Sequence, residues 1–299
     1  MTDWRNAVLP PWRPGLAGWL RIVLRGVPIA LITYAGLLVL LLVRLIERPV
    51  FGLSRPVTPW ITQFVCRAAL WIMGIPVIVR GRAMTGEGAI VANHSSWLDI
   101  FVMNASARIY FVSKAEVAGW AVIGWLARAT GTVFISRKGS EAAAQAGLLE
   151  ARLRAGHRLL FFPEGTSTDA LRILPFKSTL FAAFFAGELP GRLRIQPVSA
   201  VYLAPHGEDP RFYGWWGDMA FAPHFLRMLA QGRQGRVEVT FHAPVAVAAF
   251  RDRKALDIHC EQVVRAARDA ALAANGRATA ALRSERSHPD QRDTIRKGP

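Results

Sequence analysis

Hydrophobic residues are distributed differently before and after Arg80. Eighteen consecutive residues, 26–43, carry no charge, whereas past Arg80 short apolar runs alternate with segments of helical composition. This change of pattern predicts a division of the chain into three parts. We expect membrane-anchoring helices over residues 1–80, a folded domain over 81–275 and a polar tail over 276–299.

The uncharged run at residues 26–43 is just long enough to cross a bilayer as a helix, because about twenty apolar residues are needed. A cleaved signal peptide is an alternative, but the run begins late and is followed by Arg44 in place of small residues. A buried core helix would need only one apolar face, whereas this run is apolar all round. Arginines flank both ends, so charge does not fix the orientation of the run.

A second apolar stretch covers residues 60–79 and contains Gln63 and Arg67. These polar positions indicate an amphipathic helix that lies against the bilayer or against the domain. Pro76 is expected to end this helix, because proline has no N–H for the helical hydrogen bond.

The region after residue 80 has the alternation of an α/β domain. Apolar runs of strand length lie at residues 88–92, 109–112, 132–135, 158–162, 195–202 and 236–241. Segments of helical composition lie at residues 96–105, 115–129 and 140–155, with Ser140 as a candidate N-cap. Strands that alternate with helices predict a central sheet with helices packed on it.

The composition limits the partners of this protein. Hydrophobic residues make up 52% of the chain, which excludes a disordered protein, and 37 basic against 21 acidic residues give a formal charge of +16. Such a charge favours nucleic acid or an anionic membrane surface. The ten tryptophans favour the membrane, and no nucleic-acid-binding signature is present. Only Cys66 and Cys260 are cysteines, which indicates a reducing compartment without a disulfide framework or a zinc site.

The first candidate for chemistry is the segment Asn93-His94-Ser95-Ser96-Trp97-Leu98-Asp99, where a strand meets a helix. Asp99 in the first helical turn could accept a hydrogen bond from His94 and leave the other ring nitrogen as a proton acceptor. A structural alternative is a capping box formed by Ser96 and Asp99. The two interpretations are compatible.

The second candidate is the segment Phe161-Phe162-Pro163-Glu164-Gly165-Thr166-Ser167-Thr168-Asp169. A glycine turn with hydroxyls and a carboxylate can bind a polar head group, although such turns are more often plain loops. It is no nucleophile elbow, because Asp169 stands where that motif requires glycine. Arg137 follows another strand and Lys177 lies near the glutamate turn, so both could hold an anion. The remaining histidines show no metal-ligand spacing, and no metal site is expected.

In order and spacing, these segments resemble the glycerolipid (lysophospholipid) acyltransferase family over about residues 85 to 205. The matching residues are His94 with Asp99, Phe134 with Arg137, Phe162-Pro163-Glu164-Gly165-Thr166, and Gln196-Pro197-Val198. The resemblance implies an α/β acyltransferase domain, with a central mixed sheet flanked by helices, carried on N-terminal membrane helices.

The resemblance also implies a mechanism. In that family the histidine removes the proton of an acceptor hydroxyl, the aspartate orients the histidine, and the hydroxyl attacks an acyl thioester directly. His94 and Asp99 would take these two roles. The head group of the acceptor would be held by Arg137, Glu164, Gly165, Thr166, Ser167 and Lys177.

Two details of the sequence bear on the acceptor. Family members that act on lysophosphatidate commonly carry arginine where this chain has Ser167. Together with the segment Phe212-Tyr213-Gly214-Trp215-Trp216-Gly217-Asp218-Met219, this resembles the bacterial lyso-ornithine lipid O-acyltransferase branch. The expected acceptor is therefore a lyso-aminolipid, with 1-acylglycerol-3-phosphate as the alternative.

The resemblance further implies the partners and the compartment. The donor would be an acyl carrier protein or coenzyme A thioester, with no other cofactor, no metal and no nucleic acid. Because such thioesters are cytoplasmic, the expected location is the bacterial inner membrane, with the catalytic domain facing the cytoplasm.

Overall fold

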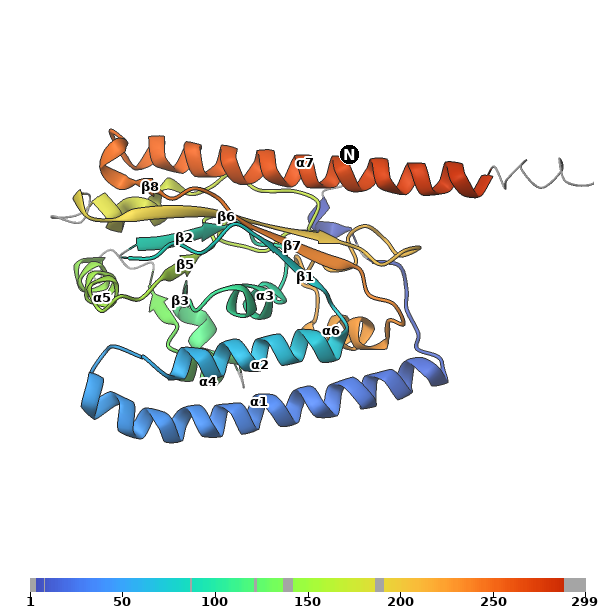
Figure 1. The fold of residues 1–299 in the computed structure, drawn as a ribbon, viewed down its shortest axis with the longest axis horizontal. Helices are drawn as coiled ribbons and strands as arrows, with labels where there is room; N and C mark the ends of the chain where they lie inside the picture. Colours follow the sequence, from blue (N-terminus) through green and yellow to red (C-terminus); the bar gives the residue numbers. More distant parts are fainter. Residues whose placement is uncertain are drawn as a thin grey trace, which may run out of the picture.

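The centre of the protein is an eight-stranded mixed sheet. We describe it from a computed structural model, which covers residues 4–7, 9–86, 88–120, 123–136, 142–185 and 191–287. In space the strands follow the order β1-β7-β6-β2-β5-β3-β4, with β8 beside β6 (Figure 1). The strands are β1 (Val77–Arg80), β2 (Gly88–Ala92), β3 (Tyr110–Lys114), β4 (Val133–Ile135), β5 (Leu159–Phe161), β6 (Arg194–Leu203), β7 (Arg236–Phe241) and β8 (Val245–Ala246).

Most of the sheet is parallel, as expected where helices connect successive strands. β2 pairs in parallel with β5 and β6, and β3 with β4 and β5, whereas β7 and β8 run antiparallel to β6. This confirms the mixed sheet. The predicted strands at 88–92 and 236–241 agree with β2 and β7 residue for residue, and the other four differ by at most two residues at either end.

The helix of the second apolar stretch ends shortly before Pro76, the residue that was expected to end it. This helix, α2 (Thr58–Met73), stops before Gly74, which has a left-handed φ of 77° and caps the helix. Residues 77–79 therefore belong to β1, which pairs in parallel with β7. Pro76 comes two residues after this cap and separates the helix from the strand, as proline commonly does.

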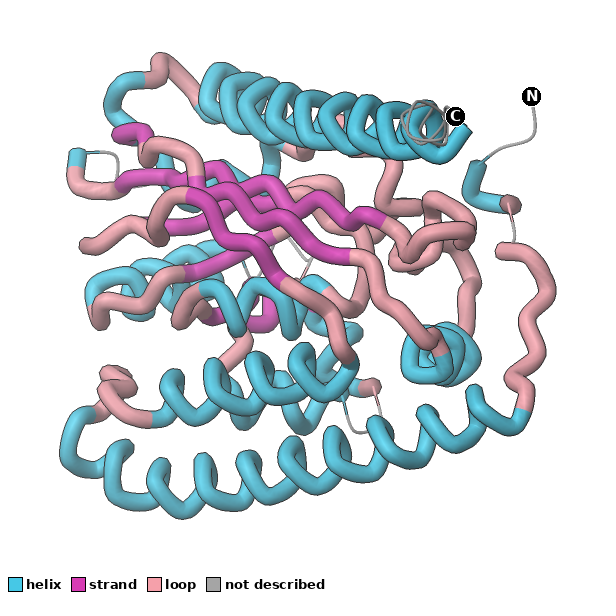
Figure 2. Tube along the Cα trace, turned by 45° about the vertical axis from the view of Figure 1, so that its right-hand side comes forward, coloured by secondary structure: helices cyan, strands magenta, loops and turns pink. Residues whose placement is uncertain are grey.

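Helices cover both faces of the sheet (Figure 2). They are α1 (Leu16–Phe51), α2, α3 (Asp99–Ser106), α4 (Ile123–Thr130), α5 (Ala142–Arg154), α6 (Phe221–Ala230) and α7 (Arg253–Ser287). Along β2, Ile90 and Ala92 belong to a core cluster with residues of α1, α2, α3 and α6, whereas Ala89 and Val91 belong to a second cluster with residues of α7 and of a 3-10 helix at Ser178–Phe185. Because alternate strand residues face opposite sides, β2 is apolar throughout.

Several helix boundaries differ from the prediction. The helix expected at residues 96–105 begins at Asp99, and the one expected at 115–129 is divided into a 3-10 helix and α4. α6 and α7 were not predicted, and α7 continues past Gly276 as far as Ser287. Ser140, the candidate N-cap, lies outside the described residues. Cys66 and Cys260 are buried on opposite faces of the sheet and are both free.

α1 is the one helix of the described chain that is long and apolar enough to cross a membrane. It nevertheless lies along the side of the domain, next to α2 and α6 (Figure 1). At its start, Arg21 and Arg25 donate to the main-chain carbonyls of residues 229–231, which end α6. At its other end, the buried Glu47 accepts hydrogen bonds from Thr58. The start of α1 is therefore held by α6 of the domain, and its other end by the first turn of α2.

The segment before α1 also contacts the domain. Trp216 donates its indole N–H to the carbonyl of Ala7 at 3.1 Å, and Arg227 donates to the carbonyl of Pro10 at 3.0 Å. The chain thus touches the domain before α1 as well as after it.

Candidate active site

Two loops meet at the carboxyl edge of the sheet. His94 follows β2 and Glu164 follows β5, and these neighbouring strands are parallel, so both loops leave the sheet at the same edge. The Glu164 carboxyl group accepts hydrogen bonds from the N–H of His94 at 2.7 Å and from the N–H of Leu174 at 2.6 Å. Thr168 donates its N–H to the carbonyl of His94 at 3.0 Å. The first and second candidate segments, whose His94 and Glu164 are 70 positions apart in the sequence, therefore form one unit.

His94 and Asp99 form the expected pair. The distance between His94 Nδ1 and Asp99 Oδ2 is 2.7 Å. Asp99 is fully buried, whereas the imidazole side chain is 22% exposed. A buried carboxylate at this nitrogen favours the tautomer that carries its proton on Nδ1, which leaves Nε2 with a lone pair. The pair has the geometry of a general base and its orienting group.

The ring of His94 is also held from its face. It stacks on Phe162, with the ring centroids 4.1 Å apart and the planes 10° from parallel. In the part of the chain that the structure describes, Nε2 has no hydrogen-bond partner. The imidazole is thus fixed by Asp99 and Phe162, while its basic nitrogen remains available to a substrate.

Asp99 has three further hydrogen-bond donors. The main-chain N–H groups of Ser95 and Ser96 reach Oδ2 at 2.8 and 3.0 Å, and the Tyr202 hydroxyl donates to Oδ1. Burial, and then the charge of Asp99, raise the pKa of Tyr202 well above its ordinary value, which keeps this phenol protonated as a donor. Tyr202 lies in β6 and was not identified from the sequence, where it belongs to an apolar strand.

Only half of the capping box is present. Asp99 accepts from the N–H of Ser96, as such a box requires, but α3 begins at Asp99 itself. Leu98 occupies the N-cap position without a side-chain cap, and the buried Ser96 hydroxyl has no partner among the described residues. The Asp99 carboxylate therefore accepts hydrogen bonds from the loop and from the imidazole and does not act within a conventional helix cap.

The predicted binding residues divide into exposed and buried groups. Thr166 and Lys177 are exposed, and Lys177 Nζ lies against Gly165, where an added Cβ would approach it to 2.8 Å. Gly165 also has a left-handed φ of 72°, so the turn requires glycine. Ser167 is 8% exposed, and Arg137 lies outside the described residues. The structure thus brings Gly165, Thr166 and Lys177 together on an accessible turn beside His94.

Glu164 is placed differently from the expectation. It is 1% exposed, and both of its oxygens accept main-chain hydrogen bonds inside the loop pair. Burial raises its pKa to about 8, against the two N–H donors, which lower it. The expected contact with a head group is not available to this side chain here. Glu164 instead holds the main chain of His94 through the hydrogen bond from its N–H.

A third segment closes on these loops. Trp215 donates its main-chain N–H to the carbonyl of Ser95 at 3.0 Å, and Gly214 lies so close to Asp169 that an added Cβ would come within 2.5 Å of the main chain of Asp169.

Asn93 is a further supporting residue whose role the sequence did not reveal. Its amide exchanges two hydrogen bonds with the main chain of Ala200, at 2.8 and 2.9 Å, and joins the loop to β6.

We predict that Glu164→Gln weakens the dependence of stability on pH. Since the pKa of Glu164 is raised from 4.5 to about 8, the folded protein keeps a proton in this interval that the unfolded chain has released. Stability from the protonated group is therefore lost as the pH rises, by up to about 1.4 kcal/mol per pH unit. Thermal unfolding in detergent, followed between pH 5 and 8, should show a shallower decline for the variant. Parallel curves for both proteins would contradict this assignment.

Comparisons with known proteins agree with this geometry. A family model described as Acyltransferase matches residues 77–201. A lyso-ornithine lipid O-acyltransferase of Rhodobacter capsulatus is 58% identical over 263 residues, which cover 88% of this chain and 95% of that protein. A 1-acyl-sn-glycerol-3-phosphate acyltransferase of Neisseria gonorrhoeae is 32% identical over 59% of this chain and 68% of that protein.

A solved structure shares the fold. The crystal structure of the 1-acyl-sn-glycerophosphate acyltransferase of Thermotoga maritima matches with a TM-score of 0.54 and 20% identity, over 83% of this chain and 98% of that one. The strand-end motifs, their meeting at one sheet edge and the identity to the Rhodobacter protein agree with one another. The chain therefore belongs to the lysophospholipid acyltransferase family, in the branch of the bacterial lyso-ornithine lipid O-acyltransferases, and is an acyltransferase.

Proposed function

We propose that this protein moves a fatty acyl group from an acyl carrier protein or coenzyme A thioester to the hydroxyl of a lyso-aminolipid of the lyso-ornithine type. The observation that carries the proposal is the His94–Asp99 pair, whose Nε2 is free at the accessible edge of the sheet. A lipid alcohol is a weak nucleophile at neutral pH, so a base of this kind is what its acylation requires.

In the proposed reaction, Nε2 of His94 removes the hydroxyl proton as the oxygen attacks the thioester carbonyl. The tetrahedral intermediate then collapses, the carbon–sulfur bond breaks, and the thiolate leaves with the proton from the imidazolium. Asp99 stabilises the transient positive charge on the ring. The thioester supplies the driving force, so we expect no metal and no further cofactor.

Two residues act in this proposal through their neighbours. Tyr202 donates to Asp99 and Glu164 holds the main chain of His94, and neither has a path to the substrate. We therefore assign them as positioning residues. The accessible turn with Gly165, Thr166 and Lys177 is the part of the described site that we expect to contact the acceptor head group.

The lyso-aminolipid assignment rests on charge as well as on relatives. This chain has Ser167 where lysophosphatidate enzymes commonly carry a phosphate-binding arginine. The nearby Arg172 does not replace that arginine, because it is paired with Asp169 at 2.9 Å and stacks over the ring of Trp4. Two relatives, from Rhodobacter capsulatus and Brucella abortus, are named lyso-ornithine lipid O-acyltransferases. The exposed Lys177 and the Neisseria relative favour 1-acylglycerol-3-phosphate as the second candidate acceptor.

We also propose that the enzyme lies on the cytoplasmic face of the bacterial inner membrane. Exposed apolar side chains run along α1, from Leu16 to Phe51, while its start is bound to α6 and its other end to α2. The exposed side of α1 would enter the lipid, with its axis along the surface. Thioester donors reach the site only from the cytoplasm.

His94→Ala and Asp99→Asn should each lower kcat for acyl transfer by about 10²–10⁴-fold, because general-base catalysis contributes that much. Purified full-length variants can be assayed by release of free thiol from the thioester. His206→Ala is a matched control, since this histidine is exposed and outside the site. Turnover close to wild type for His94→Ala would end the general-base proposal.

Competition between the two acceptors tests the choice of substrate. We expect lyso-ornithine lipid to be used with at least about tenfold higher kcat/KM than lysophosphatidate, because a missing charged hydrogen bond costs about 1.5–3 kcal/mol. Both lyso-lipids are offered in one assay and the products are separated by mass. A higher kcat/KM for lysophosphatidate would overturn the aminolipid assignment and leave the acyltransferase activity standing.

The membrane placement predicts that both chain ends are on one side. Epitope tags at the N- and C-termini should both be cleaved in inverted inner-membrane vesicles and both be protected in intact spheroplasts. The contact of Ala7 with Trp216 is the reason, since it keeps the N-terminal segment on the domain. Opposite accessibility of the two tags would show that α1 crosses the bilayer.

A further inference from the structure

A basic pocket lies at the edge of the sheet opposite the active site. It has a volume of about 260 Å³ and is formed between α2 and the segments that enter β2, β3 and β5. Its basic and polar lining consists of Trp60, Gln63, Arg67, Ser106, Arg108 and Arg158. β2 has five residues at about 3.3 Å each, so on the order of 16 Å of strand separates this pocket from the loop of His94.

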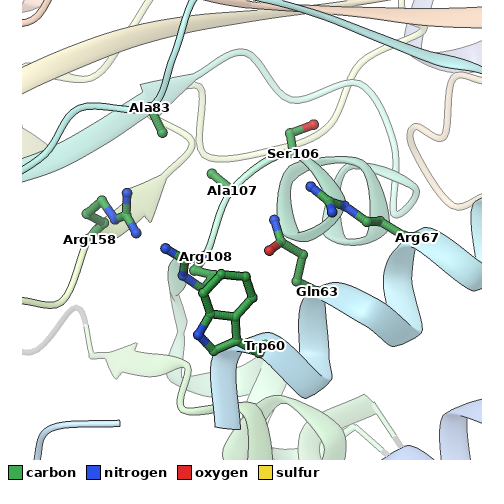
Figure 3. Close-up of a pocket in the computed structure, with 8 residues that line it drawn as sticks. All are labelled: Trp60, Gln63, Arg67, Ala83, Ser106, Ala107, Arg108 and Arg158. Carbon is green, nitrogen blue, oxygen red and sulfur yellow. The ribbon is translucent and has the colours of Figure 1, made fainter. Parts of the chain in front are cut away.

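The polar groups of the pocket face a common space. Figure 3 shows Arg108 and Arg158 on one side and Gln63 and Arg67 on the other, with their polar ends turned toward the space between them. The guanidinium of Arg108 lies 3.8 Å from the centre of the Trp60 ring. This stacking holds Arg108 in place, and its N–H groups, at the edge of the guanidinium plane, have no hydrogen-bond partner within the described ranges.

Hydrogen bonds within the protein use only part of the donor capacity of these side chains and do not neutralise their charge. Arg67 and Gln63 each donate one hydrogen bond to the carbonyl of Ala105 at the end of α3, and Arg158 donates one to the carbonyl of Met84. Among the described residues, none of the three arginines has a carboxylate partner. Burial, and then the nearby charge of Arg108, lower the pKa of Arg158. Three like charges therefore converge without a counter-charge.

The mouth of the pocket adjoins a surface suited to lipid. Trp60, Phe64, Arg67 and Trp71 recur along α2 at spacings of four, three and four residues, which places them on one side of the helix, and all four are exposed. Exposed tryptophans with an arginine between them are typical of the membrane interface. Trp60 and Arg67 belong both to this row and to the pocket.

We propose that this pocket binds the phosphate group of an anionic membrane phospholipid, at a site separate from the acyl-transfer centre. Guanidinium forks match phosphate oxygens, and the gathered positive charge favours a lipid with net negative charge. The volume accommodates a head group, while the acyl chains would stay with the aromatic row of α2. The pocket would anchor the amino edge of the sheet to the anionic leaflet.

Binding of soluble short-chain lipids to the full-length protein in uncharged detergent tests this proposal by calorimetry. Dihexanoyl phosphatidylglycerol should bind more tightly than dihexanoyl phosphatidylcholine or inorganic phosphate. The double variant Arg108→Gln/Arg158→Gln should weaken phosphatidylglycerol binding at least about tenfold, since each arginine near anionic lipid contributes about fivefold. Arg251→Gln/Arg253→Gln removes the same charge from an exposed surface near α7 and should bind as wild type does.

Two further measurements keep the test decisive. Thiol release in detergent should be unchanged in the pocket variant, which shows that it is folded, and Arg108→Lys/Arg158→Lys should recover part of the binding. Unchanged phosphatidylglycerol binding in the glutamine variant would overturn the proposal. If inorganic phosphate binds as tightly as the lipid, the proposal that the pocket recognises a phospholipid is wrong. Neither result depends on which acceptor the enzyme acylates.

Discussion

Asp99 has no exposed surface, so every partner of its charge must come from within the protein. A buried carboxylate without hydrogen bonds would cost several kcal/mol, or would be neutralised. Asp99 begins α3, and its donors come from two other places: the imidazole and main chain of the loop after β2, and Tyr202 of β6. The site can exist only when β6 lies beside β2 and α3 packs beneath them. The direction of the His94 ring is thus a property of the whole domain.

The sequence predicts what depends on short spacings. Residues 94 and 99 are five positions apart at a strand end, and a loop followed by one helical turn brings them together. The support of that pair depends on long-range contacts. Glu164 is 70 positions from His94, and Tyr202 is 103 positions from Asp99. A tyrosine within an apolar strand has the pattern of an ordinary core residue, so no local signal distinguishes it.

The missed elements have different physical reasons. β1 has only four residues and is formed by pairing with β7, some 160 positions later, which no local pattern announces. α7 did carry a signal: Leu256, Cys260 and Val264 recur every four residues and are all buried. Arginines and alanines between them obscured that stripe. Glu164 was predicted to bind the head group because it belongs to a glycine turn with hydroxyls and because of the family resemblance, whereas here both of its oxygens accept main-chain hydrogen bonds.

The attachment of α1 at both ends has a kinetic consequence. In the proposed placement of α1 along one leaflet, these contacts would hold the catalytic loops at a constant height over the lipid. The acceptor then arrives by lateral diffusion within that leaflet, and its encounter rate follows its mole fraction among the surrounding lipids. Inert lipid or detergent would slow such an enzyme by diluting the acceptor in two dimensions, even at an unchanged amount of acceptor per volume of solution.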